Sequence, residues 1–106
     1  MMMKVLTLII RKKWFDMILS GRKREEYRER KPYWLKRLIN KNGLTWKYLP
    51  RKDAVLFYEG YRKERRAMLV EIIDIGFGTG RPDWGAEAGK TCIIIQLGKI
   101  LIKSTR

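Results

Sequence analysis

Apolar residues recur along this chain with a period that changes from segment to segment. The first apolar block, Val5 to Ile10, is rich in aliphatic and β-branched residues and predicts a strand mostly buried on both faces. Trp14, Met17 and Ile18 then follow at i, i+3 and i+4, a spacing that places them on one face of a helix. Because glycine is favoured at helix C-termini, this helix of about two to three turns is expected to end near Gly21.

The next two segments differ in polarity. The stretch from Arg24 to Arg30 is too polar for a core helix and predicts an exposed or edge strand. Pro32 suits the first turn of a second helix, which is expected to stop at the polar residues 40–43. That helix would carry four apolar residues on one face: Trp34, Leu35, Leu38 and Ile39.

The remaining sequence is typical of strands separated by glycine-containing turns. Three blocks are dense in Val, Ile, Leu and aromatic residues: Ala54 to Tyr58, Arg66 to Phe77, and Thr91 to Ile102. The chain has 106 residues, no internal repeat and no Ser/Pro-rich linker, so we expect residues 1–106 to form a single domain. One strand, two helices and a run of strands favour an α+β fold around a curled or barrel-like sheet over an alternating βαβ sheet.

Charge gives the first indication of a partner. The sequence has 25 Lys and Arg against 11 Asp and Glu, a formal net charge of +14, and its positive field attracts polyanions. Nucleic acid is the first expectation, with a solubility bias as the alternative and an anionic membrane surface as a weaker one. The oligomeric state stays open.

The composition also excludes several kinds of chemistry. The sequence has no histidine, so no mechanism can use imidazole as a base or a metal ligand. Its single Cys92 can form neither an intrachain disulfide nor a zinc-ligand set, so we expect no metal and no cofactor. Residues 1–10 lack the features of a signal peptide, and no apolar run is long enough to span a bilayer. These features favour a cytoplasmic protein with no membrane partner.

Two glycine-rich segments resemble nucleotide-binding motifs without their context. Residues 76–80 are followed by a turn, where a dinucleotide-binding motif needs a helix. Residues 85–91 are one residue short of a P-loop and lead into a strand. Both are interpreted as ordinary loop.

The segment 76–90 still carries three candidate nucleic-acid contacts: Arg81, Trp84 and Lys90. It either covers a groove, supplying phosphate contacts and a surface for base stacking, or is a plain surface connection. The sequence leaves both open.

The most informative stretch follows the first predicted helix. Gly21, Lys23, Glu26 and Arg28 form the pattern Gly-x-Lys-x-x-Glu-x-Arg, in which glycine allows a sharp turn. In a strand, Glu26 and Arg28 share a face, and Lys23 is spaced to converge with them at a turn-to-strand corner.

This pattern is the signature of the ASCH domain, and the chain resembles that PUA-like family over most of its length. The resemblance implies a small PUA-like β-barrel with two or more flanking helices. It also implies a cleft for RNA, most simply single-stranded, or for a nucleotide. Lys23 and Arg28 would face phosphate or a base, and Glu26 would orient one of them or accept hydrogen bonds from a base edge. The alternative, which is compatible with this one, is a Glu26–Arg28 ion pair that fixes the turn. Three neighbours join the candidate nucleic-acid contacts: Arg22, Arg24 and Tyr27.

Some ASCH relatives are enzymes, and a small hydrolase acting on a modified nucleoside or on RNA is the alternative function. One branch is an amidohydrolase of acetylated cytidine with a lysine, a threonine nucleophile and a glutamate from a later strand; another relative is a ribonuclease. Lys23 matches the lysine, Glu71 is the candidate for the later glutamate, and Glu26 stands where the threonine would be. As an enzyme, the protein would therefore use Lys23, Glu26 and Glu71 as catalytic residues.

Aromatic residues are interleaved with the basic ones, as in proteins that bind single-stranded RNA. Trp14 and Trp34 are expected in the core because of their helical spacing. Four others lie in turn-like surroundings and are candidates for base stacking: Trp46, Tyr48, Tyr61 and Trp84. A third functional class, a protein-interaction module that docks an acidic partner, would use the same aromatic and basic residues.

Overall fold

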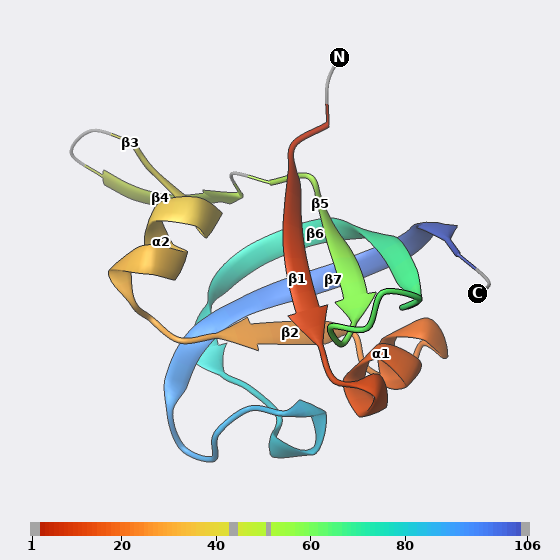
Figure 1. Cartoon of the computed structure of the whole chain (residues 1–106). Coiled ribbons are helices and arrows are strands. Elements are labelled where there is room, and N and C mark those ends of the chain that lie inside the picture. Colours follow the sequence, from red (N-terminus) through yellow and green to blue (C-terminus); the bar gives the residue numbers. More distant parts are fainter. Residues whose placement is uncertain (1–2, 43–44, 51, 105–106) are drawn as a thin grey trace.

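A curled five-stranded sheet forms the body of the protein. The computed structural model describes residues 3–42, 45–50 and 52–104, and of residues 40–42 and 45–50 it describes the backbone only. The sheet order is β1-β5-β6-β7-β2, with β1 parallel to β5 and the other pairs antiparallel (Figure 1). Its strands are β1 (Val5–Ile10), β5 (Ala54–Glu59), β6 (Ala67–Thr79), β7 (Thr91–Lys103) and β2 (Glu25–Arg28).

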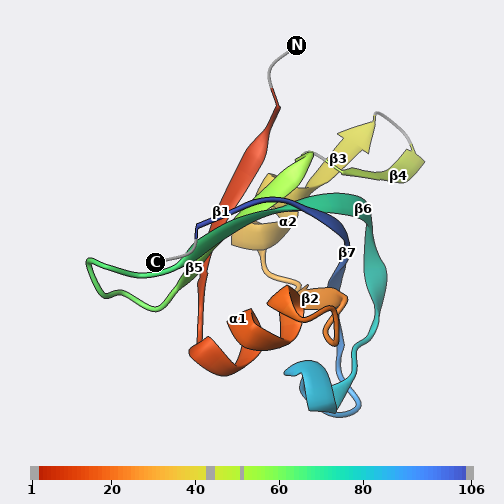
Figure 2. The ribbon, with the colours of Figure 1, turned by 90° about the vertical axis from the view of Figure 1, so that its right-hand side faces the viewer.

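Two long strands give the sheet its curvature. β6 and β7 each have 13 residues and pair along most of their length. Their register shifts at three places between Leu69 and Asp74, and such bulges bend a strand and increase its twist. The sheet therefore arches like half a barrel over α1 (Lys12–Leu19), as Figure 2 shows.

α1 fills the concave side of the arch. Its Phe15 and Ile18 are buried in one core with strand residues such as Leu8, Phe57 and Ile95. The predicted helix is confirmed, and Gly21 after it has a φ of +83°, a conformation that glycine adopts without strain. β1 differs from its prediction. Because the core lies on one side of the sheet only, its residues alternate between buried and exposed or half-buried.

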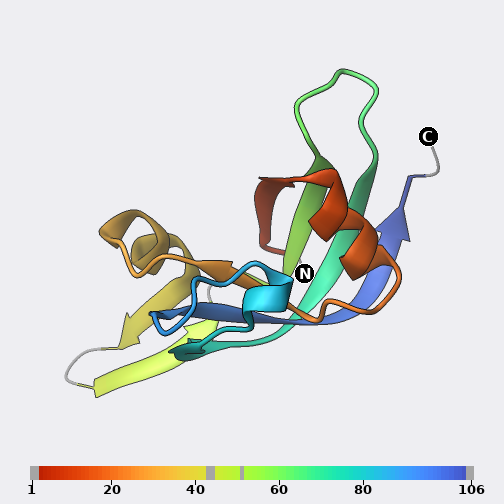
Figure 3. The same ribbon diagram turned by 90° about the horizontal axis from the view of Figure 1, so that it is seen from below.

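The second helix is shorter than expected. α2 (Pro32–Leu38) begins at proline as predicted, but Ile39 has an extended backbone and opens β3 (Ile39–Asn42). β3 pairs with β4 (Thr45–Pro50) as a separate two-stranded sheet, visible beside α2 in Figure 3. The apolar spacing predicted Ile39 as part of the helix, and the polar residues after it show no alternation that would predict this sheet.

The other predicted strands are confirmed with small changes of boundary. β2 pairs with β7 alone and is an edge strand, as expected, although Glu26 and Tyr27 on it are buried. β6 continues to Thr79, so the segment predicted as a loop over residues 76–90 begins only at residue 80. The fold is thus α+β, a curled mixed sheet with two helices, as the sequence predicted. None of the helices in the described parts of the chain is long and apolar enough to cross a membrane.

Candidate functional site

A buried lysine lies in the segment from Gly21 to Arg28 that carries the Gly-x-Lys-x-x-Glu-x-Arg pattern. Lys23 is 1% exposed, and its Nζ donates to the carbonyl oxygens of Glu25 and Trp84, both at 2.6 Å. It also lies 3.1 Å from Glu26 Oε1. An ammonium has three N–H donors, so these three acceptors use all of them. Lys23 therefore connects β2 to the loop that carries Trp84.

The turn after α1 brings this side chain inward. The Lys23 amide donates to the carbonyl of Met17 at 2.9 Å, which closes the turn around Gly21. The ammonium lies 5.4 Å from the ring centre of Trp14 and 4.9 Å from that of Tyr27. Burial lowers the pKa of Lys23 by desolvating its charged form, and the Glu26 carboxylate opposes that shift.

Glu26 is held between two cations. Its Oε1 faces Lys23 and its Oε2 lies 3.0 Å from Arg28 Nη1, while the residue is only 6% exposed. The same Arg28 nitrogen donates to the carbonyl of Tyr27 at 2.7 Å, and the guanidinium lies 5.2 Å from the ring centre of Trp34. The Glu26–Arg28 ion pair considered from the sequence is thus present. We call Lys23, Glu26 and Arg28 the motif cluster.

Tyr27 of β2 also holds the loop that follows β6. Its hydroxyl donates to Glu25 Oε1 at 2.7 Å and accepts from the Arg81 amide at 3.0 Å. Burial raises the pKa of this hydroxyl. A Cβ on Gly80 would lie 2.6 Å from Tyr27 Cε1, so only glycine lets the loop pass this ring. Tyr27, predicted to contact nucleic acid, is 9% exposed and bonds within the protein.

Two members of the motif cluster, Glu26 and Arg28, border a cavity of about 210 Å³, which we call the first cavity. Trp14 of α1 and Trp84 of the loop line it, together with Glu26 and Arg28. Its remaining lining residues are Ile9, Ile10, Arg11, Tyr27 and Gly85. Gly85 has a φ of +105°, and a Cβ there would lie 3.2 Å from Trp14 Cζ2, so this glycine lets the loop approach the indole closely.

The first cavity combines three kinds of surface. Trp14 and Trp84 contribute aromatic rings to its lining, and such rings provide surfaces against which a planar group can pack. Glu26 offers an acceptor at the wall, and Arg28 keeps N–H donors beyond those on Nη1. Such a site suits a planar ligand with hydrogen-bonding edges.

The other predicted nucleic-acid contacts are more scattered. Arg81 pairs with Asp83 at 2.7 Å and lies 4.0 Å from the ring centre of Trp84, so it covers one face of that indole. Lys90 pairs with Glu87 at 3.3 Å and is exposed. Arg22 and Arg24 are exposed, and neither lines the first cavity.

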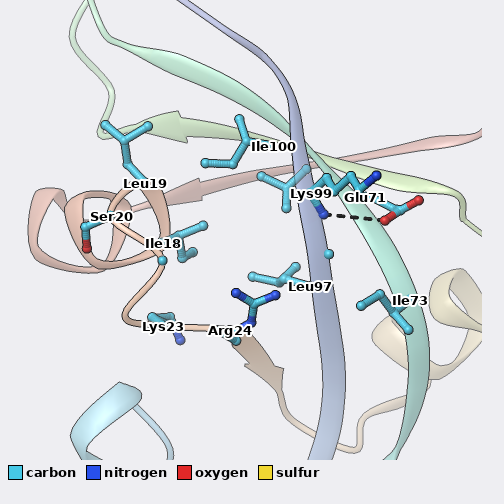
Figure 4. A pocket seen from close by; sticks show the side chains of 13 residues that line it. Ile18, Leu19, Ser20, Lys23, Arg24, Glu71, Ile73, Leu97, Lys99 and Ile100 are labelled. Atoms are coloured by element: carbon cyan, nitrogen blue, oxygen red, sulfur yellow. Dashed lines mark hydrogen bonds between the residues drawn. The ribbon is translucent and has the colours of Figure 1, made fainter.

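Glu71 faces a different hollow. It lines a cavity of about 570 Å³ between α1 and the bulged part of β6 and β7, together with Arg24 and Lys23 (Figure 4). Its Oε1 accepts from the Lys99 amide at 3.4 Å, and Figure 4 shows the carboxylate on the far side of β7 from Lys23. Glu71 is therefore not one of the three acceptors that lie around the Lys23 ammonium.

Part of this site could not be predicted from the sequence. Trp14 and Trp34 pack against the core as expected, but Trp14 also forms a wall of the cavity and Trp34 lies beside Arg28. The contact between Gly85 and Trp14 joins distant segments, and no local pattern indicates it. Trp46 and Tyr48, predicted for stacking, lie outside the residues whose side chains are described.

Comparison with known proteins adds no relative. No protein-family model, no curated protein and no solved structure matches this chain.

Within the described residues, no group of three or more Cys, Asp and Glu side chains is placed to hold a metal ion. Every buried side-chain nitrogen and oxygen described has a hydrogen-bond partner.

Proposed function

We propose that this protein binds single-stranded RNA, or a nucleotide, and that one unstacked base enters the first cavity between Trp14 and Trp84. The observation that carries the proposal is the Glu26–Arg28 pair on the wall of a cavity flanked by two indoles. Proteins that read single strands combine these elements: aromatic stacking, hydrogen bonds to a base edge and nearby positive charge.

Each side chain of the motif cluster has a separate task in this proposal. Glu26 accepts hydrogen bonds from a base edge, and Arg28 donates to the base or to its phosphate. Lys23 is a positioning residue, because its three donors already hold Glu26 and the carbonyl of Trp84. This differs from the expectation that Lys23 itself contacts phosphate, a role that passes to Arg28 and to Arg11 at the rim.

The resemblance to ASCH domains supports the same proposal. The residues of the signature, Gly21, Lys23, Glu26 and Arg28, are the ones that form the turn and the motif cluster. The curled mixed sheet with two helices is consistent with a small barrel-like fold. We therefore propose a PUA-like domain of the ASCH type.

The hydrolase alternative has less support from the geometry. It requires the Lys23 amine to act on a substrate, whereas its three N–H groups point at fixed acceptors inside the protein. It also requires Glu71, whose carboxylate accepts from the Lys99 amide and is not among the acceptors around the Lys23 ammonium. Binding without a chemical step is the function that the observed contacts favour.

The test is a fluorescence-polarisation titration of single-stranded RNA and matched DNA with the wild type and Trp84→Ala. This substitution removes the indole but keeps the main-chain carbonyl that accepts from Lys23. Stacking of one base is worth about 1–3 kcal/mol, so we expect RNA affinity to fall roughly 5- to 150-fold. RNA should also bind more tightly than DNA.

A control variant that lowers the net charge separates the contribution of the site from that of the net charge. Arg62→Ala/Lys63→Ala removes two exposed cations from the loop between β5 and β6, and neither residue lines the first cavity. This loop lies apart from the segment 80–90 in Figure 2. The variant should bind RNA at the same cavity with little loss. Equal, salt-sensitive binding by the wild type and Trp84→Ala would show that the charge of +14 alone attracts RNA and would overturn the proposal.

A further inference from the structure

A second cavity of about 320 Å³ adjoins the first at the end of β2. The two share Tyr27, Arg28 and Gly85 in their linings, so the Arg28 side chain borders both. The second cavity extends from this shared border towards Arg30 and Lys90. The two cavities therefore lie next to each other, beside the loop that follows β6.

The charges along the second cavity favour an anion. Its two carboxylates already have cationic partners, Glu29 with Lys31 and Glu87 with Lys90, both at 3.3 Å. Arg30 lies 4.7 Å from the ring centre of Phe77 and has no carboxylate partner among the residues that the structure describes. Its guanidinium therefore carries a charge that no neighbouring acid neutralises, next to a cavity open to solvent.

The size of the first cavity limits what it can hold. Sites for drug-sized ligands measure roughly 300–1,000 Å³, so a cavity of about 210 Å³ accommodates one planar ring system and little more. The sugar and phosphate of a nucleotide whose base lies there must extend outward. The second cavity, with Arg28 at the shared border, is the adjoining hollow with cations to receive them.

We propose that the two cavities bind two consecutive nucleotides of single-stranded RNA. The linking phosphate lies beside Arg28, and the second nucleotide occupies the cavity beside Arg30 and Lys90. This inference rests on the proposed function and names its substrate class: a strand of at least two nucleotides, in preference to a free nucleoside or mononucleotide.

Calorimetric titration tests this with three probes: a nucleoside, its monophosphate, and a dinucleotide of the same base that carries a terminal phosphate as well as the linking one. We expect the wild type to bind the dinucleotide roughly tenfold or more tightly than the monophosphate, because hydrogen bonds to charged groups contribute that much. The variant Arg30→Ala/Lys90→Ala should lose this advantage and still bind the monophosphate normally. Both substitutions are at exposed side chains, and a thermal melt verifies that the variant folds.

The outcomes separate this inference from the proposed function. If the wild type binds monophosphate and dinucleotide equally, or if the variant keeps the advantage of the dinucleotide, the second subsite is overturned and the proposed function stands. An equal loss in the control Arg62→Ala/Lys63→Ala would also overturn it, since net charge would then explain the effect. If Trp84→Ala binds every probe as the wild type does, the proposed function itself fails.

Discussion

At the scale of single residues, the buried Lys23 has the largest structural consequence. Its ammonium satisfies two main-chain carbonyls and one oxygen of a carboxylate that is itself buried. Removing one partner of a buried ion pair leaves uncompensated polar groups, which costs far more than losing an exposed pair. The signature lysine thus supports the position of Glu26 and of the loop at Trp84.

We predict that Lys23→Ala lowers the free energy of unfolding by about 3–5 kcal/mol, measured by urea denaturation. The matched control is Lys31→Ala, whose ion pair with Glu29 is exposed on both sides and should contribute less than about 1 kcal/mol. Similar small losses in both variants would contradict a structural role for Lys23.

A second residue-scale prediction concerns Gly80. In Gly80→Ala the new Cβ would lie 2.6 Å from Tyr27 Cε1 and 2.7 Å from the Cβ of Ala86, so the loop must move. We expect a stability loss of about 1–3 kcal/mol, typical of overpacking, together with weaker RNA binding. The control Gly76→Ala meets no atom within 4 Å and should bind RNA as the wild type does. Melting curves and polarisation titrations measure the two effects, and wild-type behaviour of Gly80→Ala would refute the close approach.

At the scale of elements, one arginine joins α1 to the β5–β6 hairpin. Arg66 pairs with Asp16 on α1 and with Glu59 on β5. Hydrogen bonds from Lys12 and Arg66 lower the pKa of Asp16, and the hydrogen bond from Arg66 lowers that of Glu59. The folded protein therefore releases protons from these carboxyls more readily than the unfolded chain does.

This linkage gives a pH dependence with a defined sign. Because both carboxyl pKa values are lowered by folding, the stabilisation is present above the unfolded values, 3.8 for Asp16 and 4.5 for Glu59. It is lost as the pH falls through the folded values. We predict that the wild type is more stable than Arg66→Ala at pH 7 and that the difference shrinks below pH 4.5, measured by urea denaturation at several pH values. A difference that is constant from pH 7 to 3 would contradict this.

Elements also show where sequence patterns fail. Dense apolar runs predicted β5, β6 and β7, because a run of this kind is typical of a buried strand. Ile39 was assigned to α2 because it continues the apolar spacing of that helix, yet its buried side chain begins β3. A single apolar residue between a helix and a strand is compatible with either element, and its packing against the core decides which one it joins.

At the scale of the whole molecule, the charge of +14 adds a long-range attraction that does not depend on the site. Binding of single strands weakens with salt by a slope of about −0.7 per phosphate neutralised on a logarithmic plot. A stacking residue contributes affinity without neutralising a phosphate. The salt dependence of RNA affinity therefore distinguishes stacking in the first cavity from the general attraction caused by the net charge.

We predict that Trp84→Ala lowers RNA affinity by the same factor at every salt concentration and leaves this slope unchanged. Arg30→Ala/Lys90→Ala should instead make the slope less negative by about 0.7–1.4, since one or two phosphate contacts are lost. Polarisation titrations at four or more salt concentrations measure both. A change of slope in Trp84→Ala would show that the indole does not act through stacking.

The sequence by itself determined both helices, the strands of the main sheet and the membership of the motif cluster. Local spacing placed α1, the turn at Gly21 and the edge strand β2. The positions of Glu26 and Arg28 on one strand face allowed their ion pair, which the sequence offered as an alternative compatible with ligand binding. These features depend on residues a few positions apart, whose geometry the backbone period fixes.

Only the tertiary structure decided what surrounds that cluster. It placed the Trp84 carbonyl, 61 positions away, on Lys23, and it directed Glu71 to Lys99 instead of to the motif. It also brought Gly85 against Trp14, which closes the first cavity. Each of these contacts depends on how far β6 and β7 curl over α1 (Figure 2). That curl comes from bulges and core packing between distant segments, so no local pattern records it.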